Sequence, residues 1–312
     1  MDDEVEEAAI GYLRDNARKE RPFALCVGFI APHFPFVVPE PYFSQYWPDK
    51  CDLPNLPADH LDELPVAARR MQKMFGLSGY TDDQILRARA AYYGLVSYLD
   101  DKIGRLLDVL QEQGLAENTV VIHTSDHGEM LGEHGLWRKM CFYEQAARVP
   151  LQVSWPGVLP AEKRIPQCVS LVDLIATILD LGGFSREERK AWELDGESLV
   201  PLLSGADTAW KDAVFSEYTA HGTDRPRAMM RVGKWKLCYS HGHPPEWELY
   251  NLESDPDEFD NLAGQPAHQD VVEDLTRRIL EKWVDPDRLE REIVNSQERR
   301  HLLHAVSKNK PF

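Results

Sequence analysis

The chain has 312 residues, and its 35 Lys and Arg residues against 52 Asp and Glu residues leave a formal net charge of −17. This acidic balance argues against nucleic acid or an anionic membrane as a partner. No apolar run reaches the roughly 18 residues of a membrane span, and the acidic first residues differ from the basic start of a signal peptide. Because the five Cys residues are scattered and form no CxxC pair, we expect a thiol-reduced, cytoplasmic protein.

Helices and strands are predicted in alternation along the first part of the chain. Apolar spacing predicts a helix over residues 2–19, and a continuous apolar run predicts a buried strand over residues 23–30. Residues 36–80, which are rich in Pro and aromatic residues, are typical of a long ordered loop. A helix with Thr81 as its N-cap is predicted over residues 81–113.

Two more predicted strands, over residues 119–124 and 149–155, and a helix over residues 171–181 continue this pattern. The order predicts an α/β fold with a mostly parallel sheet flanked by helices. Ligands of such sheets bind beyond the carboxyl ends of the strands. Since His33 and Asp126 both follow predicted strands, we expect the functional site there.

The pattern changes after about residue 201. Short strands separated by Gly, Pro and His turns predict a smaller antiparallel sheet, over residues 213–219, 228–239 and 247–252. A helix over residues 269–283 should pack on this sheet. We interpret the polar, basic end of the chain as a tail that contacts another surface, such as a second subunit. The predicted domains are an α/β domain (residues 1–205), an α+β subdomain (residues 206–285) and the tail (residues 286–312).

The strongest local signal for chemistry is Asp126 with His127, which follows a predicted strand and precedes Gly128. A carboxylate oxygen and an imidazole nitrogen at a tight turn are good ligands for a divalent metal ion. Lys139 could then reach an anion held by that ion. The alternative is that Asp126 caps a helix and His127 lies on the surface, since two-residue metal motifs also arise by chance.

His33 is the second candidate, because Pro32 and Pro35 stiffen its loop and could position the imidazole as a general acid or as a donor to a substrate oxygen. The alternative is a loop histidine that is hydrogen-bonded to the backbone. His134 is a weaker candidate for substrate contact. We interpret the remaining residues as structural or solvated: His123 in a strand, Asp100 and Asp101 on a helix, and His221, His241 and His243 near turns.

Several longer segments resemble the sulfatase branch of the alkaline-phosphatase superfamily. They occur in the family's order across about residues 3–285, and the wording of one segment and of the tail is closest to choline sulfatases. The segments are residues 32–35 (PHFP), 126–128 (DHG), 131–139 (LGEHGLWRK), 142–151 (FYEQAARVPL), 172–183, 195–203 (DGESLVPLL), 248–258 (ELYNLESDPDE) and 261–263 (NLA).

The resemblance implies an alkaline-phosphatase-like fold and the hydrolysis of a small-molecule sulfate monoester. It implies that Asp126 and His127 bind a divalent metal ion, calcium or alternatively manganese, and that Lys139 contacts the sulfate oxygens. His33 would contact the sulfate or protonate the leaving alcohol. Fixed positive charges of this kind suit a negatively charged sulfuryl group. The tail resembles the extension that choline sulfatases use between subunits, which implies a homo-oligomer.

The sequence lacks two features that the resemblance implies. Sulfatases attack with a formylglycine made from the first residue of a C/S-x-P-x-R motif, and none of the five Cys residues begins such a motif. The nearest serine, Ser254, is followed by Glu258 where the motif requires Arg. The family's paired metal-binding aspartates are also absent. We therefore expect that the chain is an N-terminally truncated sulfatase, and that it is inactive alone because it has no covalent nucleophile.

Two other functions remain open. A phosphodiesterase or phosphonate monoester hydrolase of the same superfamily would share the Asp-His pair. A non-catalytic metal-binding or interaction remnant would explain the absent nucleophile, although the retained Asp126, His127, Lys139 and His33 argue against it. The alcohol part of the substrate is not specified, since Phe34, Phe36 and Trp47 could form a cage for a cation or could pack within the loop.

Overall fold

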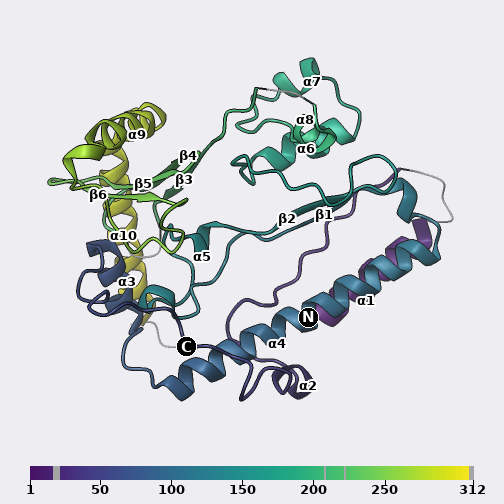
Figure 1. Ribbon diagram of the computed structural model, residues 1–312, viewed down its shortest axis with the longest axis horizontal. Helices are drawn as coiled ribbons and strands as arrows, with labels where there is room; N and C mark the ends of the chain where they lie inside the picture. Colours follow the sequence, from purple (N-terminus) through teal and green to yellow (C-terminus); the bar gives the residue numbers. More distant parts are fainter. Residues whose placement is uncertain (17–21, 207–208, 221–222, 309–312) are drawn as a thin grey trace. The chain divides into compact units, whose positions relative to one another are not determined.

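The structure, a computed structural model, divides the chain into two compact units (Figure 1). Unit 1 comprises Met1–Lys139 and Val149–Glu162, and unit 2 comprises Met140–Arg148 and Lys163–Phe312. The domain boundaries that the sequence predicts, after residues 205 and 285, stay predictions. The structure describes residues 1–16, 22–206, 209–220 and 223–308.

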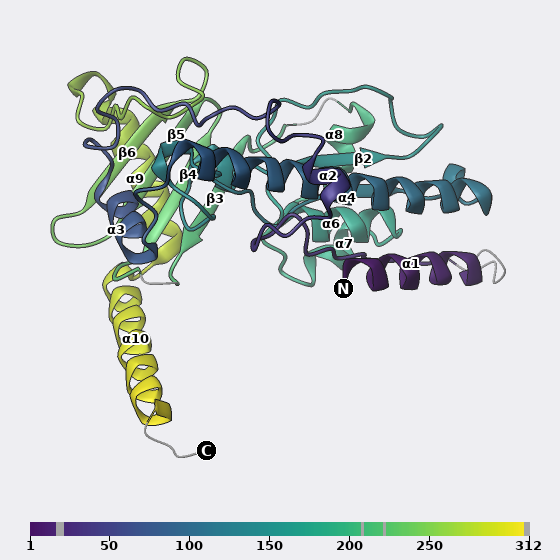
Figure 2. The same cartoon turned by 90° about the horizontal axis from the view of Figure 1, so that it is seen from below.

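The longest helix of unit 1 in the described residues is α4 (Asp82–Glu112). It begins as predicted at Thr81, whose side chain accepts a hydrogen bond from the Gln84 backbone N–H in a capping box. Helix α1 (Asp2–Asn16) lies beside α4 (Figure 2). Leu13, Val109 and Leu110 form a buried cluster between the two helices. The predicted helix over residues 2–19 is thus confirmed as far as residue 16, and its remainder lies outside the described residues.

Strands β1 (Val121–Thr124) and β2 (Leu151–Ser154) confirm two predicted strands of unit 1. They pair in an antiparallel ladder, so this pair does not show the parallel arrangement that we expected. Their connection contains only η2 (Glu133–Gly135) and α5 (Glu144–Ala147), and no long crossover helix of the kind that links parallel neighbours.

The buried strand predicted over residues 23–30 is wrong. This segment belongs to neither of the two sheets that the structure describes, and most of its residues are exposed. Of its side chains, Phe23 packs against the α1–α4 cluster. A strand requires neighbours for its backbone N–H and C=O groups, and apolar composition alone does not supply them.

The segment predicted as a long loop, residues 36–80, contains two helices, α2 (Glu40–Phe43) and α3 (Val66–Phe75). Helix α3 ends at Gly76, which adopts a left-handed conformation (φ 60°) that a glycine takes without strain. Met71 and Ala68 bury the inner face of α3. The high content of Pro and aromatic residues around α3 hid this helix in the sequence.

Unit 2 is built on the sheet β3 (Ala213–Tyr218), β4 (Arg227–Val232), β5 (Trp235–Ser240) and β6 (Glu246–Asn251). Adjacent strands in this sheet are antiparallel, as predicted, and the strands lie side by side in the order of the chain. The single strand expected over residues 228–239 is two strands, because Gly233 (φ 53°) turns the chain between them.

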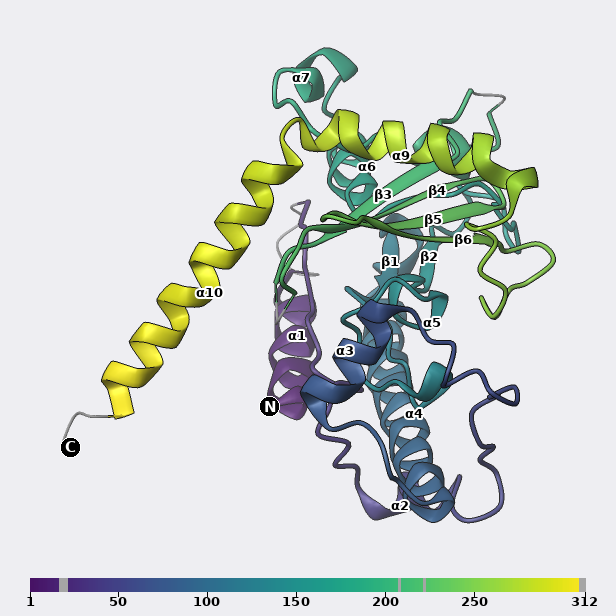
Figure 3. The same ribbon diagram turned by 90° about the vertical axis from the view of Figure 1, so that its left-hand side faces the viewer.

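Helix α9 (Gln269–Trp283) lies across one face of this sheet, as the sequence predicts (Figure 3). Leu275 and Ile279 of α9 pack on Leu237 and Leu249 of the sheet. Side chains alternate between the two faces of a strand. Lys236 and Cys238 therefore point to the opposite face from Leu237, where Phe142 contacts Cys238.

Unit 2 also contains three short helices, α6 (Asp173–Leu181), α7 (Arg186–Lys190) and α8 (Val200–Ser204). Asp173 is fully buried, and its carboxylate accepts hydrogen bonds from Lys211 Nζ and from the backbone of Glu197 in the DGxS segment. Gly196 of that segment touches the backbone of Val172, where a Cβ would lie 2.1 Å from the carbonyl oxygen.

The tail is a helix, α10 (Pro286–Lys308), with one buried residue, Ile293. Leu302 and Leu303 remain 65% and 68% exposed, and the predicted contact with another subunit stays a prediction. None of the helices in the described residues is long and apolar enough to span a membrane.

Candidate functional site

The four residues predicted to carry the chemistry come together in unit 1. The imidazole rings of His33 and His127 lie 5.7 Å apart between centroids, edge to face. Lys139 Nζ lies 2.5 Å from His33 Nε2, and Asp126 adjoins His127. His33 and Lys139 are 106 positions apart in the sequence, so this meeting depends on the fold.

His33 has a fixed orientation in this site. Its Nδ1 lies 2.6 Å from the carbonyl oxygen of Phe34, so that nitrogen carries the proton and Nε2 faces Lys139 as an acceptor. The ring also stacks on the Phe34 ring, with centroids 4.4 Å apart. The sequence left open whether His33 serves the site or bonds to the backbone. The structure shows the bond to the backbone, which also places the ring beside Lys139, and the role of His33 toward a substrate stays a prediction.

Asp126 and His127 offer two atoms suited to one metal ion. His127 Nδ1 lies 2.8 Å from the Gly128 carbonyl oxygen, which leaves the lone pair on Nε2. That Nε2 lies 3.6 Å from Asp126 Oδ2, and the Asp126 side chain is 84% exposed. No helix starts at Asp126, which excludes the capping alternative. The residues therefore fit as a pair of ligands, although no third His, Cys, Asp or Glu in the described part of the chain completes a group of three with them.

The segment before Lys139 is a tight loop, residues 129–138, closed by its own backbone. The Met130 N–H donates to the Arg138 carbonyl, and the Gly132 N–H donates to the Leu136 carbonyl, both at 2.8 Å. Gly132 has a φ of 93°, and a Cβ there would lie 2.7 Å from Pro54. Only glycine fits such a position without strain, so the loop that ends in Lys139 has a defined shape.

Arg89 of α4 anchors this loop, and sequence reasoning missed it. Its guanidinium donates to the Leu131 carbonyl and to Glu133 Oε1, each at 2.9 Å, and to Asp52 Oδ1 at 3.1 Å. The residue is only 5% exposed. The sequence did contain a signal for Arg89. It lies three positions before Tyr92, on the face of the predicted helix that carries the apolar residues. A charged side chain buried on that face needs a partner of opposite charge or a hydrogen bond.

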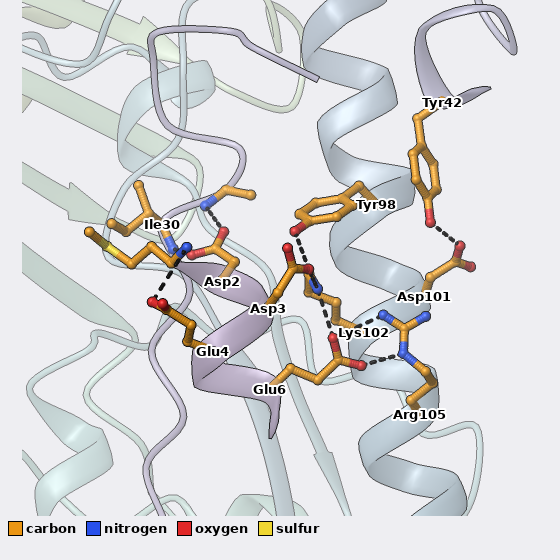
Figure 4. Close-up of polar contacts among 12 residues, drawn as sticks. Asp2, Asp3, Glu4, Glu6, Ile30, Tyr42, Tyr98, Asp101, Lys102 and Arg105 are labelled. Carbon is orange, nitrogen blue, oxygen red and sulfur yellow. Dashed lines mark hydrogen bonds and ion pairs between the residues drawn. The ribbon is translucent and has the colours of Figure 1, made fainter. Parts of the chain in front are cut away.

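The other end of the site is held by α1. Asp2 accepts hydrogen bonds from the backbone N–H groups of Ile30 and Ala31, directly before the His33 loop (Figure 4). The fully buried Lys102 of α4 bonds to Asp3 and Glu6 of α1. The contact with Lys102 lowers the pKa of Asp3, and Arg105 together with Lys102 lowers the pKa of Glu6. Although burial opposes it, hydrogen bonding to these carboxylates raises the pKa of Lys102. Ion pairs thus fix α1, and α1 fixes the start of the loop.

A pocket of about 350 Å³ in unit 1 is lined by Phe34 and Arg138, the chain neighbours of His33 and Lys139. The Arg138 guanidinium lies over the Phe34 and Phe75 rings, 4.6 and 4.5 Å from their centroids. Trp47 takes no part, because it packs on Phe43 and under Arg87 instead. The residues lining the pocket are Phe34, Phe36, Phe75, Leu77, Tyr80, Gln84, Ala88, Glu129, Trp137 and Arg138.

The other residues considered from the sequence lie outside the candidate site. His134 is 1% exposed and lies 2.9 Å from His60, ring nitrogen to ring nitrogen, so a substrate does not reach it. Asp101 is solvated as predicted and accepts a hydrogen bond from Tyr42. His123 is half-buried in β1. The prediction for His221 falls outside the described residues.

Two family models match the chain. The model described as Sulfatase matches residues 1–184, and the one described as N-sulphoglucosamine sulphohydrolase, C-terminal, matches residues 132–285. The chain belongs to the sulfatase family. The resemblance predicted from the sequence is thereby confirmed.

Curated relatives of this sulfatase chain include the choline-sulfatase of Rhizobium meliloti (strain 1021), 35% identical over 295 residues, which covers 93% of this chain and 56% of the relative. Arylsulfatase K of Rattus norvegicus is 33% identical over 280 residues, 82% of this chain and 48% of the relative. The sulfatase chain therefore spans about half the length of the curated relatives that it matches.

Solved structures similar to the sulfatase chain include the phosphonate monoester hydrolase of Agrobacterium radiobacter, with a TM-score of 0.74 and 27% identity, covering 88% of this chain and 59% of that one. The corresponding enzyme of Silicibacter pomeroyi also has a TM-score of 0.74, with 28% identity and coverages of 90% and 61%. These likenesses confirm the predicted α/β fold class.

Proposed function

We propose that the chain forms part of the active site of a metal-dependent sulfuric ester hydrolase, which cleaves a sulfate monoester. The observation that carries this proposal is the meeting of Lys139, His33 and the Asp126–His127 pair in one place. Membership of the sulfatase family supports it.

In this proposal, Asp126 supplies an oxygen and His127 supplies Nε2 to a divalent metal ion, calcium or manganese. Such an ion supplies positive charge that stabilises the sulfuryl oxygens. Lys139 donates hydrogen bonds to those oxygens, and its ammonium group balances their charge. His33 takes up a proton at Nε2 from solvent and delivers it to the oxygen of the leaving alcohol, while Lys139 keeps its ammonium charge.

The alcohol part of the substrate binds, we propose, in the pocket that begins at Phe34 and Arg138, because both residues directly adjoin His33 and Lys139 in the chain. Aromatic side chains line much of this pocket and suit an apolar or aromatic alcohol. The Arg138 guanidinium already covers the Phe34 and Phe75 faces, so these rings do not form an open cage for a cation.

No C/S-x-P-x-R motif occurs among these 312 residues, so they supply no formylglycine nucleophile. We therefore propose that the chain is inactive alone. A phosphonate monoester hydrolase is the second candidate, and the two structural neighbours with that activity in their titles support it.

The test expresses the longest reading frame that contains these residues and measures the turnover of aryl sulfate, choline sulfate and aryl phosphonate monoesters. Lys139→Ala should lower kcat/KM for the sulfate ester by about 10²–10³-fold. Lys73→Ala, an exposed lysine on α3, is the matched control and should change little. An unchanged rate in Lys139→Ala would contradict the assigned site, and a preference for the phosphonate would favour the second candidate. Turnover by the 312 residues alone would disprove the inactivity.

A further inference from the structure

A second cluster of metal-ligating side chains belongs to unit 2, whereas the residues of the proposed sulfatase chemistry belong to unit 1. His241 and His243 lie in the turn after β5, and Asp287 is the second residue of α10. One ligand atom from each residue lies within 4.8 Å of the others. In the described part of the chain, no other group of three His, Cys, Asp or Glu residues meets this condition.

The distances in this cluster match the spacing of ligands on one ion. His241 Nε2 lies 2.7 Å and His243 Nε2 lies 3.7 Å from Asp287 Oδ1. A tetrahedral zinc ion with bonds of about 2.0–2.1 Å separates its ligand atoms by about 3.3 Å. The two measured distances lie on either side of this value, so shifts of about half an ångström would accommodate the ion.

The ligand atoms are also oriented for an ion. His241 Nδ1 lies 3.0 Å from the hydroxyl of Tyr239, a residue of the sheet core, which fixes the ring and presents Nε2 to Asp287. Gly242, with a φ of 144°, separates the histidines in this turn, and their rings lie 5.8 Å apart between centroids, edge to face.

Access from solvent is open on one side. The His241 side chain is 9% exposed, whereas those of His243 and Asp287 are 82% and 58% exposed. Water can therefore complete the coordination of an ion held by the three residues.

We propose that His241, His243 and Asp287 bind a divalent transition metal ion, and that the ion fastens the first turn of α10 to the turn after β5. Two imidazole nitrogens and one carboxylate oxygen with an open position suit zinc. The sequence assigned no chemistry to either histidine. The signal was the His-Gly-His spacing, but Asp287, 44 positions beyond His243, is found only in the fold.

The test titrates zinc chloride into the metal-free chain that carries Asp126→Asn and His127→Gln, so that the other pair cannot bind. Calorimetry should show one equivalent bound, and the chain should melt at a higher temperature with zinc. His243→Gln and Asp287→Asn should each weaken binding at least tenfold and abolish the thermal shift. His304→Gln, an exposed histidine on α10 outside the cluster, is the matched control and should bind normally.

Cobalt in place of zinc gives an independent readout of the ligands. Intense visible absorption bands, lost in His243→Gln, would support a tetrahedral site made by these residues. Equal affinity in His243→Gln and the parent chain, or no bound equivalent in the parent, would overturn the proposal. Because the titration measures no turnover, neither result bears on the sulfatase function.

Discussion

Units 1 and 2 both bury charged side chains, but Arg89 of unit 1 stands on a helix and Lys236 of unit 2 stands on a strand. In unit 1, Arg89 of a helix bonds to a loop carbonyl and two loop carboxylates. In unit 2, Lys236 of β5 lies 2.7 Å from Glu258 and 3.0 Å from Glu144, on a sheet that is already held by three ladders. Arg89 thus holds a loop of the candidate site in place, whereas Lys236 and its two carboxylates are buried against one face of a regular sheet.

The comparison is tested most strongly by removing the buried cation of unit 2. Lys236→Met leaves Glu258 and Glu144 without their shared partner, so we expect the free energy of unfolding to fall by about 3–5 kcal/mol at pH 8. Lys234→Met is the matched control, because Lys234 is half-exposed and lies 4.0 Å from the exposed Glu253, and it should cost less than about 1 kcal/mol. Urea unfolding followed by tryptophan fluorescence measures both, and equal losses would contradict a special role for Lys236.

The second prediction concerns the pH dependence of the same pair. Burial raises the pKa of Glu258 to about 7, more than Lys236 lowers it. The folded chain therefore binds a proton that the unfolded chain releases near its ordinary value of 4.5, so this contribution to stability is complete below about pH 4.5 and is lost as the pH rises through 7.

Glu258→Gln should remove this dependence. The difference in unfolding free energy between the parent chain and Glu258→Gln should decline by up to about 3 kcal/mol between pH 4.5 and pH 8. Glu253→Gln, at a carboxyl group that is 74% exposed, is the control and should give a difference that stays level. A difference that grows with pH would show that Lys236, not burial, dominates the titration of Glu258.

The smallest expected effect on stability is in unit 1. Arg89→Met removes charge-assisted hydrogen bonds to Leu131 and Glu133 and should cost about 2–3 kcal/mol. Its consequence should be local: hydrogen exchange of residues 129–138 should accelerate, while that of the β3–β6 sheet should not. Arg87→Met, on the same helix but half-exposed, should leave the loop protected. Equal acceleration in both units would refute the idea that Arg89 serves the loop.

Elements with local signals were predicted well. The capping box at Thr81 and the apolar spacing after it located α4, and the spacing in α9 matched its bounds, Gln269–Trp283. The prediction of a strand over residues 23–30 failed because a strand depends on a distant partner and not on a local signal. A continuous apolar run forms a strand only where a neighbouring strand can pair with it.

The sequence by itself determined the family, the main helices and the residue types of the candidate site, because caps, periodicity and motifs depend on neighbours a few positions apart. Only the tertiary structure decided that Lys139 meets His33 across 106 positions, and that Arg89 reaches Leu131 across 42. The same holds for Asp287 and the two histidines of the turn. The partners of a buried charge and the members of a ligand set are the groups that the fold places within a few ångströms of one another. The spacing of these residues along the chain does not predict such contacts.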